Sequence, residues 1–392
     1  LDLNLVFSGH GKHLDCPTLR LTNHHGLMIA GEAALSNWDA GMDMYIYGKL
    51  GNLTMTKEGI NVLMTNLTGK VPPILQRLDY IRFNGEAAGY LHDLTLTGLF
   101  HTGAGMVKTD VMMSIDEQSM SRTYSGSVAS ADLDLGKLLN QEKKFGKVDF
   151  NVELKGFNYK NRYPESYIKG IISSFEYSQY QYENIMLDGV YKDGGFNGRL
   201  SMDDANGSVQ IDGNFNVAKT IPDFNLKASV KNLRPHDLHL SDKYENASIS
   251  LGLTADFTGK SIDDMNGRIS LDSLQLNAPD ERGCFLDNLT ITAGQVSGEK
   301  ELRINSSFMT AVIRGDYSYH TIPASVVKTV QRYIPSLLTI KDKMPEPHNN
   351  FQFDICLENA EVLSKLFQIP LELYLPASLK GYFNDGEEKL HV

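Results

Sequence analysis

The residues of this sequence that could do chemistry are acids and histidines beside turn-forming residues. Asp203-Asp204-Ala205-Asn206-Gly207 offers two carboxylates and an amide to a cation. An EF-hand calcium loop needs D-x-[DN]-x-[DN]-G and a Glu at its twelfth position, and only Asp204, Asn206 and Gly207 fit. Because Asp, Asn and Gly also tolerate tight-turn geometry, we interpret the segment as the bend of a β-hairpin.

Histidines and glycine-rich segments indicate turns more than ligand sites. His24 and His25 are adjacent, so on a strand they would face opposite sides, and His10 and His13 have no evident third ligand. The segment SGHGKHLD lacks the spacing of a phosphate-binding P-loop. The segment HTGAGMVKTD is followed by a strand-like run, so it does not match a dinucleotide fingerprint.

Catalytic motifs are equally hard to find. There is no GxSxG, no HExxH and no cysteine-protease signature, and the acidic pairs at 203–204 and 263–264 lie in turn-like segments. A polysaccharide-cleaving enzyme would need two carboxylates about 5 to 9.5 Å apart in a cleft. Cys16, Cys284 and Cys356 form an odd, scattered set without CxxC spacing. We therefore expect no enzymatic activity, no metal site, no cofactor and no disulfide scaffold.

Charge and length exclude further classes. The chain has 392 residues and a net charge of −11 without a long basic run, which argues against a nucleic-acid partner. No run of about twenty apolar residues exists, so no segment predicts a membrane-spanning helix. The first residues, LDLNLVFSGHG, already alternate apolar and polar, and the last resemble a hairpin cut short. We expect the chain to be an interior piece of a longer protein, with any membrane anchor outside it.

The elements that position these residues are predicted to be strands, because apolar and polar residues alternate over most of the chain. Such period-two runs are typical of antiparallel sheets with one apolar and one wet face. Turn residues at 192–195, 203–207 and 263–267 separate the runs, which indicates consecutive hairpins. The apolar faces that we single out contain Val148, Phe150, Val152, Leu154, Leu200, Met202, Val209, Ile211, Phe215, Val217, Leu226, Ile249, Leu251, Leu253 and Phe257.

Helical spacing replaces this alternation in four short stretches. One follows Thr56, with Ile60, Leu63, Met64 and Leu67 on one side, and one follows Asp134. A third runs between Pro323 and Pro335, and the last between Asn359 and Pro370. These amphipathic helices would lie on the apolar face of the sheet or on a membrane surface; their polar faces are not notably basic, which favours the sheet.

Two further patterns concern the strands themselves. Tyr177, Tyr180, Tyr182 and Tyr191 could line a sugar-binding surface, but tyrosine is also a good strand former with a wet tip, and we favour that structural role. The hexapeptide NGRLSM at 197–202 recurs as NGRISL at 266–271, which suggests lateral stacking of like units.

The fold class predicted from these patterns is mainly β: an elongated antiparallel meander sheet, curled into an open apolar groove, with a few short amphipathic helices. We expect residues 1–392 to form one continuous segment, with approximate sub-blocks 1–146, 147–340 and 341–392. Its inward apolar residues would be the functional surface.

The order of helices and strand blocks resembles that of the TamB/AsmA-like translocation and assembly module family, most closely the long TamB-type proteins of Bacteroidetes. The stretches that carry the resemblance are 56–111, 134–156, 182–215 and 309–337. Each is of low specificity alone, and we expect the C-terminal domain that carries the family's most recognisable pattern to lie outside this interior segment. The resemblance implies a periplasmic protein anchored in the inner membrane, with a β-taco-like trough and phospholipid as its partner. In some members an outer-membrane barrel of the TamA type is a further partner.

Two functions are compatible with this reading of the sequence. The apolar face could conduct lipid between the inner and outer membranes, or the same faces could close into the dry core of a β-rich surface or adhesin-type scaffold. Period-two patterning does not separate them, because both arrangements bury one face.

Overall fold

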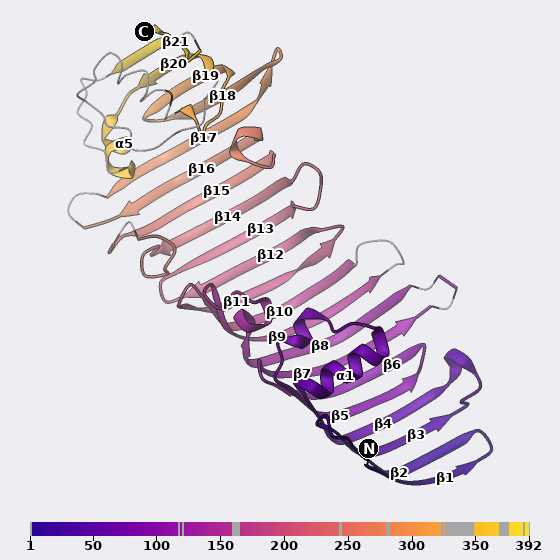
Figure 1. Ribbon diagram of the computed structural model, residues 1–392. Helices are drawn as coiled ribbons and strands as arrows, with labels where there is room; N and C mark the ends of the chain where they lie inside the picture. Colours follow the sequence, from indigo (N-terminus) through magenta and orange to yellow (C-terminus); the bar gives the residue numbers. More distant parts are fainter. Residues whose placement is uncertain are drawn as a thin grey trace. The chain divides into compact units, whose positions relative to one another are not determined.

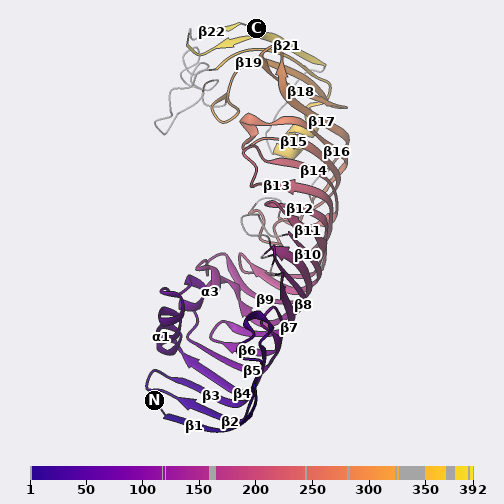
Figure 2. The same ribbon diagram turned by 90° about the vertical axis from the view of Figure 1, so that its right-hand side faces the viewer.

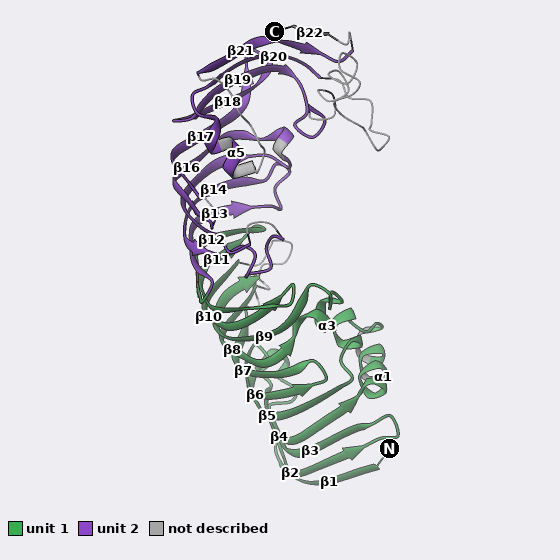
Figure 3. Ribbon diagram, turned by 90° about the vertical axis from the view of Figure 1, so that its left-hand side faces the viewer, with its two compact units in different colours: residues 1–205 green, residues 206–392 purple. Residues whose placement is uncertain are grey.

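The computed structural model describes residues 2–116, 118–119, 121–158, 165–242, 245–279, 283–322, 325, 349–367, 376–386 and 389–391. These residues are mainly in β-strands, with a few short helices, as the sequence predicts (Figure 1). The chain divides into two compact units, Leu1–Ala205 and Asn206–Val392 (Figure 3). The division falls in the Asp203–Gly207 turn, away from the expected block boundaries, and residue 147 lies inside a strand.

The described residues of unit 1 form twelve strands. Their bounds are β1 Asp2–His10, β2 His13–Thr22, β3 Leu27–Ser36, β4 Tyr45–Thr56, β5 Tyr80–Tyr90, β6 Asp93–Thr102, β7 Gly105–Ile115, β8 Arg122–Asp134, β9 Phe145–Asn158, β10 Glu165–Tyr177, β11 Tyr180–Lys192 and β12 Gly195–Asp204. Its helices are η1 Gly41–Asp43, α1 Lys57–Thr68, α2 Pro73–Gln76 and α3 Leu135–Leu139.

Unit 2 contains the remaining described strands. Their bounds are β13 Gly207–Asn216, β14 Asp223–Leu233, β15 Ser248–Thr258, β16 Asn266–Asn277, β17 Cys284–Val296, β18 Glu299–Ser306, β19 Met309–Asp316, β20 Asn350–Leu357, β21 Ala377–Asn384 and β22 Lys389–His391. Its helices are η2 Ile262–Asp264 and α5 Ala360–Phe367.

Within each unit, successive strands pair antiparallel, so the predicted meander of hairpins is confirmed. No pairing among the described strands closes either unit into a barrel. The turn segments 192–195 and 203–207 join strands as expected, and both glycine-containing segments that resembled phosphate loops are hairpin turns. His24 and His25 lie in the turn between β2 and β3 instead of on a strand.

The predicted helices form where their caps indicated. The Thr56 hydroxyl accepts a hydrogen bond from Gly59 N at the start of α1, and the Asp134 carboxylate accepts one from Lys137 N at the start of α3. α1 and α3 lie on the same side of the unit 1 strands (Figure 2). The Asn359 side chain accepts a hydrogen bond from Glu361 N at the start of α5. The helix expected between Pro323 and Pro335 lies outside the described residues. No helix among those described is long and apolar enough to cross a bilayer.

Bulges interrupt several ladders. The register of β8 against β9 shifts between Ser130 and Leu133, where Asp132 has a φ of 53°. The register of β14 against β15 shifts between Val230 and Leu233, where Asn232 has a φ of 49°. A bulge bends its strand and increases the local twist, so each strand changes direction at such a position.

The repeated hexapeptide has a common structural role in the two units. Gly198 and Gly267 both face a neighbouring strand so closely that an added Cβ would lie 2.3 and 2.2 Å from the carbonyl oxygens of Asp188 and Asp256. The arginine that follows each glycine is paired across the ladder with that same aspartate. The repeat therefore fixes a close approach of two strands and places an arginine opposite an aspartate in the ladder.

Candidate functional site

The predicted groove residues of unit 1 form rows that run across the strands on one face. Val152 on β9 lies opposite Val128 on β8 and Gly170 on β10. Gly170 lies opposite Leu187 on β11, and Leu187 lies opposite Leu200 on β12. Directly opposed residues of an antiparallel pair point to the same face, so these five residues, four of them with apolar side chains and one a glycine, form one row over five strands.

Two parallel rows flank this one. The pairings on one side connect Ser130, Phe150, Ile172, Ile185 and Met202, and those on the other side connect Gly126, Leu154, Ile168, Gly189 and Gly198. Apart from one serine, the three rows contain only apolar residues and glycine. The predicted residues Phe150, Val152, Leu154, Leu200 and Met202 therefore share one face.

The opposite face of the same strands carries charge. Glu153, Lys169, Asp188 and Arg199 are paired across β9 to β12 in alternating sign, and Lys169 Nζ lies 3.3 Å from Asp188 Oδ2. Tyr167 donates a hydrogen bond of 2.9 Å to Asp188. This hydrogen bond, with that from Lys169, holds the pKa of Asp188 below its ordinary value. One face of unit 1 is thus apolar and the other wet.

Helices cover part of the apolar face of unit 1. Ile60 of α1, which is 1% exposed, lies in one buried cluster with Ile81, Leu133 and Val148 of the strands. Phe150 packs against this cluster. We call the strand residues Ile81, Leu133, Val148 and Phe150 the covered strip. The prediction that Val148 lines an open groove is wrong, because the residue is 5% exposed in a packed core.

A second part of the same face lies farther along the strands. We call Val128, Val152, Leu154, Ile168, Leu187 and Leu200 the open strip. All six are half-buried, and none of them belongs to the buried clusters formed by the described residues. The open strip thus combines apolar side chains of two neighbouring rows, and these side chains retain solvent contact.

A polar clasp fixes the helical cover of unit 1. Lys137 Nζ of α3 donates hydrogen bonds to Asp79 Oδ2 at 2.7 Å and to Gly103 O at 2.9 Å. Arg77 donates a hydrogen bond to Leu138 O. The Lys137 hydrogen bond holds the pKa of Asp79 below its ordinary value. These contacts connect residues that are 58, 61 and 34 positions apart in the sequence. The cover is therefore tied to the sheet by hydrogen bonds as well as by packing.

Unit 2 repeats the apolar rows. Val209, Ile211 and Phe215 on β13 lie opposite Val230, Ala228 and Phe224 on β14, respectively. These β14 residues lie opposite the predicted residues Leu251, Leu253 and Phe257 on β15, while Leu226 lies between Gly213 and Ala255. The rings of Phe224 and Phe257 are stacked with centroids 4.7 Å apart.

Val217 was predicted to continue the β13 face, and this prediction is wrong. Strand β13 ends at Asn216, whose side-chain oxygen accepts hydrogen bonds from Ala218 N at 3.0 Å and Lys219 N at 3.2 Å. An Asn side chain that bonds the following backbone in this way starts a turn. Val217 is consequently 60% exposed and lies outside the row.

Helix α5 covers one end of the unit 2 face. The α5 cluster, as we call it, consists of Leu274, Leu286, Phe308, Leu357, Ala360 and Val362. The predicted residues Ile249 and Leu251 pack against it. A separate cluster buries Ala293, Leu302 and Phe383. Leu253 and Phe257, on the same strand face as Leu251, belong to none of the clusters of described residues.

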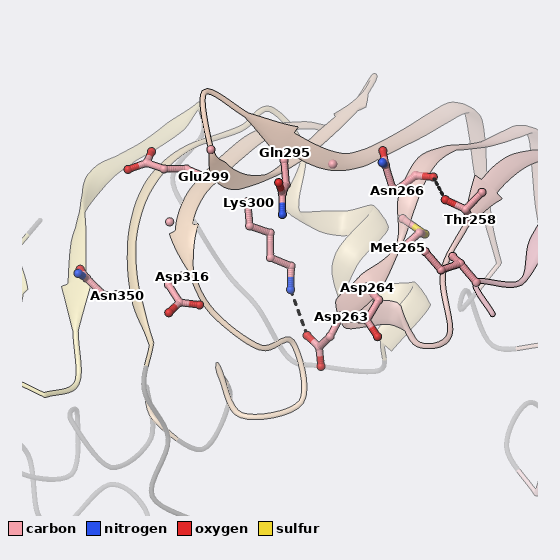
Figure 4. A pocket seen from close by; sticks show the side chains of 14 residues that line it. Thr258, Asp263, Asp264, Met265, Asn266, Gln295, Glu299, Lys300, Asp316 and Asn350 are labelled. Carbon is pink, nitrogen blue, oxygen red and sulfur yellow. Dashed lines mark hydrogen bonds and ion pairs between the residues drawn. The ribbon is translucent and has the colours of Figure 1, made fainter.

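Unit 2 also has a polar pocket of about 690 Å³, formed by turns and strand ends (Figure 4). Lys300 Nζ lies 3.4 Å from Asp263 Oδ1 and donates a 3.0 Å hydrogen bond to Tyr317 O. It also lies 4.8 and 4.7 Å from the ring centroids of Tyr317 and Tyr319. Burial alone would raise the pKa of Asp263, but hydrogen bonds from Ser318, Tyr319 N and Lys300 outweigh it and lower the pKa. The side chains of Asp263 and Lys300 therefore connect the turns that form this pocket.

The other chemical candidates of the sequence have structural partners. Asp204, the last residue of β12, accepts a hydrogen bond from Tyr180 at 2.5 Å and one from Glu183 N at 3.1 Å. This acid therefore joins the end of β12 to the start of β11. Tyr182 is 7% exposed and packs against Tyr180, with ring centroids 4.8 Å apart. Cys16, Cys284 and Cys356 are free thiols. No group of three or more metal-ligating side chains occurs among the described residues.

The sequence predicted that amphipathic helices lie on the apolar face of the sheet, as α1, α3 and α5 do, but it did not indicate which strand residues they cover, and it missed the polar pocket. Asp263 was recognised only as a turn acid, and Lys300, Tyr317 and Tyr319 were not singled out. The amphipathic helices were the one usable signal for the covers. With the acids and tyrosines assigned to structural contacts, the partly covered apolar face is the remaining candidate for a binding surface. No protein-family model, curated protein or solved structure matches this chain.

Proposed function

We propose that the apolar face of this chain shields the acyl chains of phospholipid, as one segment of a protein that carries lipid across an aqueous space. The observation that supports the proposal is the open strip of unit 1. Its members lie on neighbouring strands, so they form a continuous apolar path across the ladder. Such a path shields a chain along its whole length and requires no catalytic residue.

The energetics of lipid in water set this requirement. An acyl chain of about fifteen methylenes costs about 12 kcal/mol to expose, at about 0.8 kcal/mol each. Lipid therefore moves through water only along a surface that keeps most of its methylenes covered. In the proposed function the sheet curls around the open strip as a groove, and the charged face that carries Glu153, Lys169 and Asp188 faces water.

The cellular setting belongs to the same proposal. The segment would lie in the periplasm of a Gram-negative cell, between inner and outer membrane, within a larger TamB-type protein anchored elsewhere in its chain. An outer-membrane barrel of the TamA type would be its partner through parts outside these residues. Phospholipid would be the direct ligand of the residues described here.

Site-specific photocrosslinking tests the proposal. Val152 and Glu153 are neighbours on β9 with opposite orientation, and each is replaced in turn by p-benzoylphenylalanine. After incubation with vesicles of phosphatidylethanolamine and phosphatidylglycerol, we expect lipid adducts at position 152 at least about fivefold above those at 153. Adducts at neither position, or equal adducts at both, would refute an apolar conduit.

A closed scaffold is the second candidate, and the buried clusters favour it. Val148 and Leu286, at 5% and 1% exposed, show that parts of both units are packed as dry cores. If the open strip is closed against another surface in solution, a small polar probe and a lipid would be excluded alike. In that case a cysteine introduced by Val152→Cys would resist maleimide labelling, whereas the conduit predicts labelling that lipid vesicles suppress.

A further inference from the structure

The charged face of unit 1 carries an exposed aromatic ring at the end of β5. The ladder pairings connect Glu86 of β5, through β6, β7 and β8, to Glu153 of β9, so Glu86 lies on the same face as the charged row of β9 to β12. Tyr90 lies four residues farther along β5 and therefore points to this face as well. Tyr90 is 44% exposed. A large ring is thus open to solvent on the face opposite the open strip.

Neighbouring rings hold Tyr90 in one orientation. Tyr45 lies directly opposite on β4, and the two rings are T-shaped to each other with centroids 5.4 Å apart. The His92 ring stacks on Tyr90 with centroids 5.4 Å apart and an interplanar angle of 11°. His92 Nδ1 in turn lies 2.9 Å from Met42 O, at hydrogen-bond distance. A ring that is already oriented loses little conformational freedom when it binds a ligand, so Tyr90 is a preorganised contact surface.

A cavity of about 420 Å³ adjoins this ring on the same face. Ala88, two residues before Tyr90, and Thr95, its partner on β6, line the end of the cavity nearest the ring. The Ala88 side chain is a single methyl group, so it leaves the space beside Tyr90 unfilled. Lys49 of β4 and Glu86 line the other end, directly opposite each other in the ladder. The ring and the cavity therefore follow one another along β5.

The charged groups of this cavity have hydrogen-bonding capacity to spare. Within the part of the chain that the structure describes, neither Lys49 nor Glu86 makes a hydrogen bond or an ion pair. On β10 and β11 the equivalent opposed pair is closed, because Lys169 Nζ lies 3.3 Å from Asp188 Oδ2 and Tyr167 donates a hydrogen bond to the same carboxylate. The pair on β4 and β5 is thus available to a ligand, whereas the pair on β10 and β11 is satisfied within the fold.

We propose that Tyr90 and this cavity bind an uncharged oligosaccharide of the extended, β-1,4-linked class. The cavity lining carries one positive and one negative charge, so the charges cancel and favour a neutral ligand. A sugar ring has a C–H face that packs on an aromatic ring and a rim of hydroxyl groups that donate and accept hydrogen bonds. An aromatic platform with a few polar groups beside it is therefore the arrangement that such a ligand requires.

Each polar group has a defined part in this binding. Glu86 accepts hydrogen bonds from sugar hydroxyls and Lys49 donates them. The Thr97 hydroxyl, which donates to Asp110 at 3.1 Å, is left to accept one. Tyr90 and Glu86 are four residues apart on one strand, about 13 Å, so the ligand must span more than one sugar ring in an extended form. The inference is independent of lipid binding, because it concerns the opposite face of the sheet.

Isothermal titration calorimetry of the full chain with chitotetraose and with cellotetraose tests the proposal. We expect saturable binding of at least one of them, and a loss of affinity of at least about tenfold in Tyr90→Ala. Tyr90→Phe keeps the ring and should stay within about threefold of wild type. Glu86→Ala removes a side chain that has no hydrogen-bond partner among the described residues, so the fold should be unaffected while the affinity falls about fivefold. The matched control is Tyr167→Ala, since Tyr167 lies on the same face and is 36% exposed; it should stay within about twofold.

Three results would count against the site. Binding of neither oligosaccharide would overturn the proposal outright. Affinity that is unchanged in Tyr90→Ala, or that falls equally in Tyr167→Ala, would contradict the placement of the site at β4 to β6. Affinity that is unchanged in Glu86→Ala would contradict the part assigned to the cavity. Lipid crosslinking at Val152 reports on the opposite face, so the two proposals fail or stand separately.

Discussion

Val148 and Val152 lie on the same strand and point to the same face, yet their surroundings differ. Val148 is 5% exposed beneath α1 and α3, whereas Val152 is half-buried and belongs to none of the described clusters. The strand contributes the same residue type in the same orientation to both places. The difference shows that the strands supply a uniform apolar face, and that inserted helices decide which part of it becomes core.

This division has a functional consequence. A face covered throughout would be a stable scaffold with nothing left to bind, and an uncovered one would be an aggregation hazard. In unit 1 the covered strip, with Ile81 and Leu133, stabilises the fold, while the open strip retains an accessible surface. We infer that stability and binding are assigned to adjacent parts of the same strands.

The largest expected effect comes from removing the centre of the cover. Ile60→Ala deletes a side chain that is 1% exposed, so we expect the free energy of unfolding of unit 1 to fall by about 3 to 4 kcal/mol. Hydrogen exchange of peptides from β5 and β9 in increasing urea measures this. Val62→Ala on the same helix, where the side chain is 36% exposed, is the control and should cost below about 0.5 kcal/mol. Equal costs would mean that α1 does not form a core with the sheet.

One matched pair of substitutions tests the difference between the surroundings of Val148 and those of Val152. Val148→Ala should lower the free energy of unfolding by about 2 kcal/mol, because it leaves a cavity in a packed cluster. Val152→Ala removes the same atoms from a half-buried position and should cost less than about 1 kcal/mol. Hydrogen exchange in peptides of β9 gives both values. If Val152→Ala costs as much as Val148→Ala, the open strip is packed in solution and the conduit loses its support.

How much of this could be read from the sequence depends on the range of the interaction involved. Val209, Ile211 and Phe215 were predicted to share a face, and their pairing with β14 confirms it. The alternation of side chains is a property of the strand alone, so it is visible locally. The caps at Thr56 and Asp134 are local as well, and both were predicted correctly.

The cover of Val148 could not be predicted, because it comes from elsewhere in the chain. Residues 57–78 and 135–139 supply it, and their amphipathic pattern does not say which strand positions they reach. The end of β13 was missed for a different reason: the Asn216 side chain starts a turn before the apolar alternation ends. The polar pocket of unit 2 joins turns that are far apart in the sequence, with Asp263 and Lys300 meeting only in the fold.

A smaller effect is expected from the polar clasp of the covered strip. Lys137→Met keeps the methylene stem but loses the hydrogen bonds to Asp79 and Gly103 O, and should cost about 1 kcal/mol at neutral pH. Because Lys137 lowers the pKa of Asp79 in the folded protein, the ionic part of this stability is present above the unfolded pKa of Asp79. It is lost as the pH falls through the lowered folded pKa.

Urea denaturation of both proteins across the acid range measures this linkage. The difference in the free energy of unfolding between wild type and Lys137→Met should therefore become smaller as the pH falls. At low pH only the contribution of the hydrogen bond from Lys137 to Gly103 O should remain. Lys147→Met is the control, since Lys147 and Asp132 form a well-exposed ion pair whose loss should be nearly neutral. A stability difference that stays constant with pH would mean that the charge of Asp79 contributes nothing to the clasp, and that the hydrogen bond to Gly103 O and packing supply all of it.

The smallest effect is expected from a single polar change on the open strip. Val152→Thr keeps the shape and β-branching of the side chain, and its hydroxyl can still reach solvent, so the free energy of unfolding should fall by only about 0.5 kcal/mol. Lipid adducts from p-benzoylphenylalanine at Leu200 should stay within about twofold of wild type, because a chain of about fifteen methylenes touches many side chains at once. The matched change Val148→Thr buries the same hydroxyl beneath α1 and should cost more. If Val152→Thr alone abolished the lipid adduct, lipid would bind at a localised site centred on β9 and not over a distributed surface.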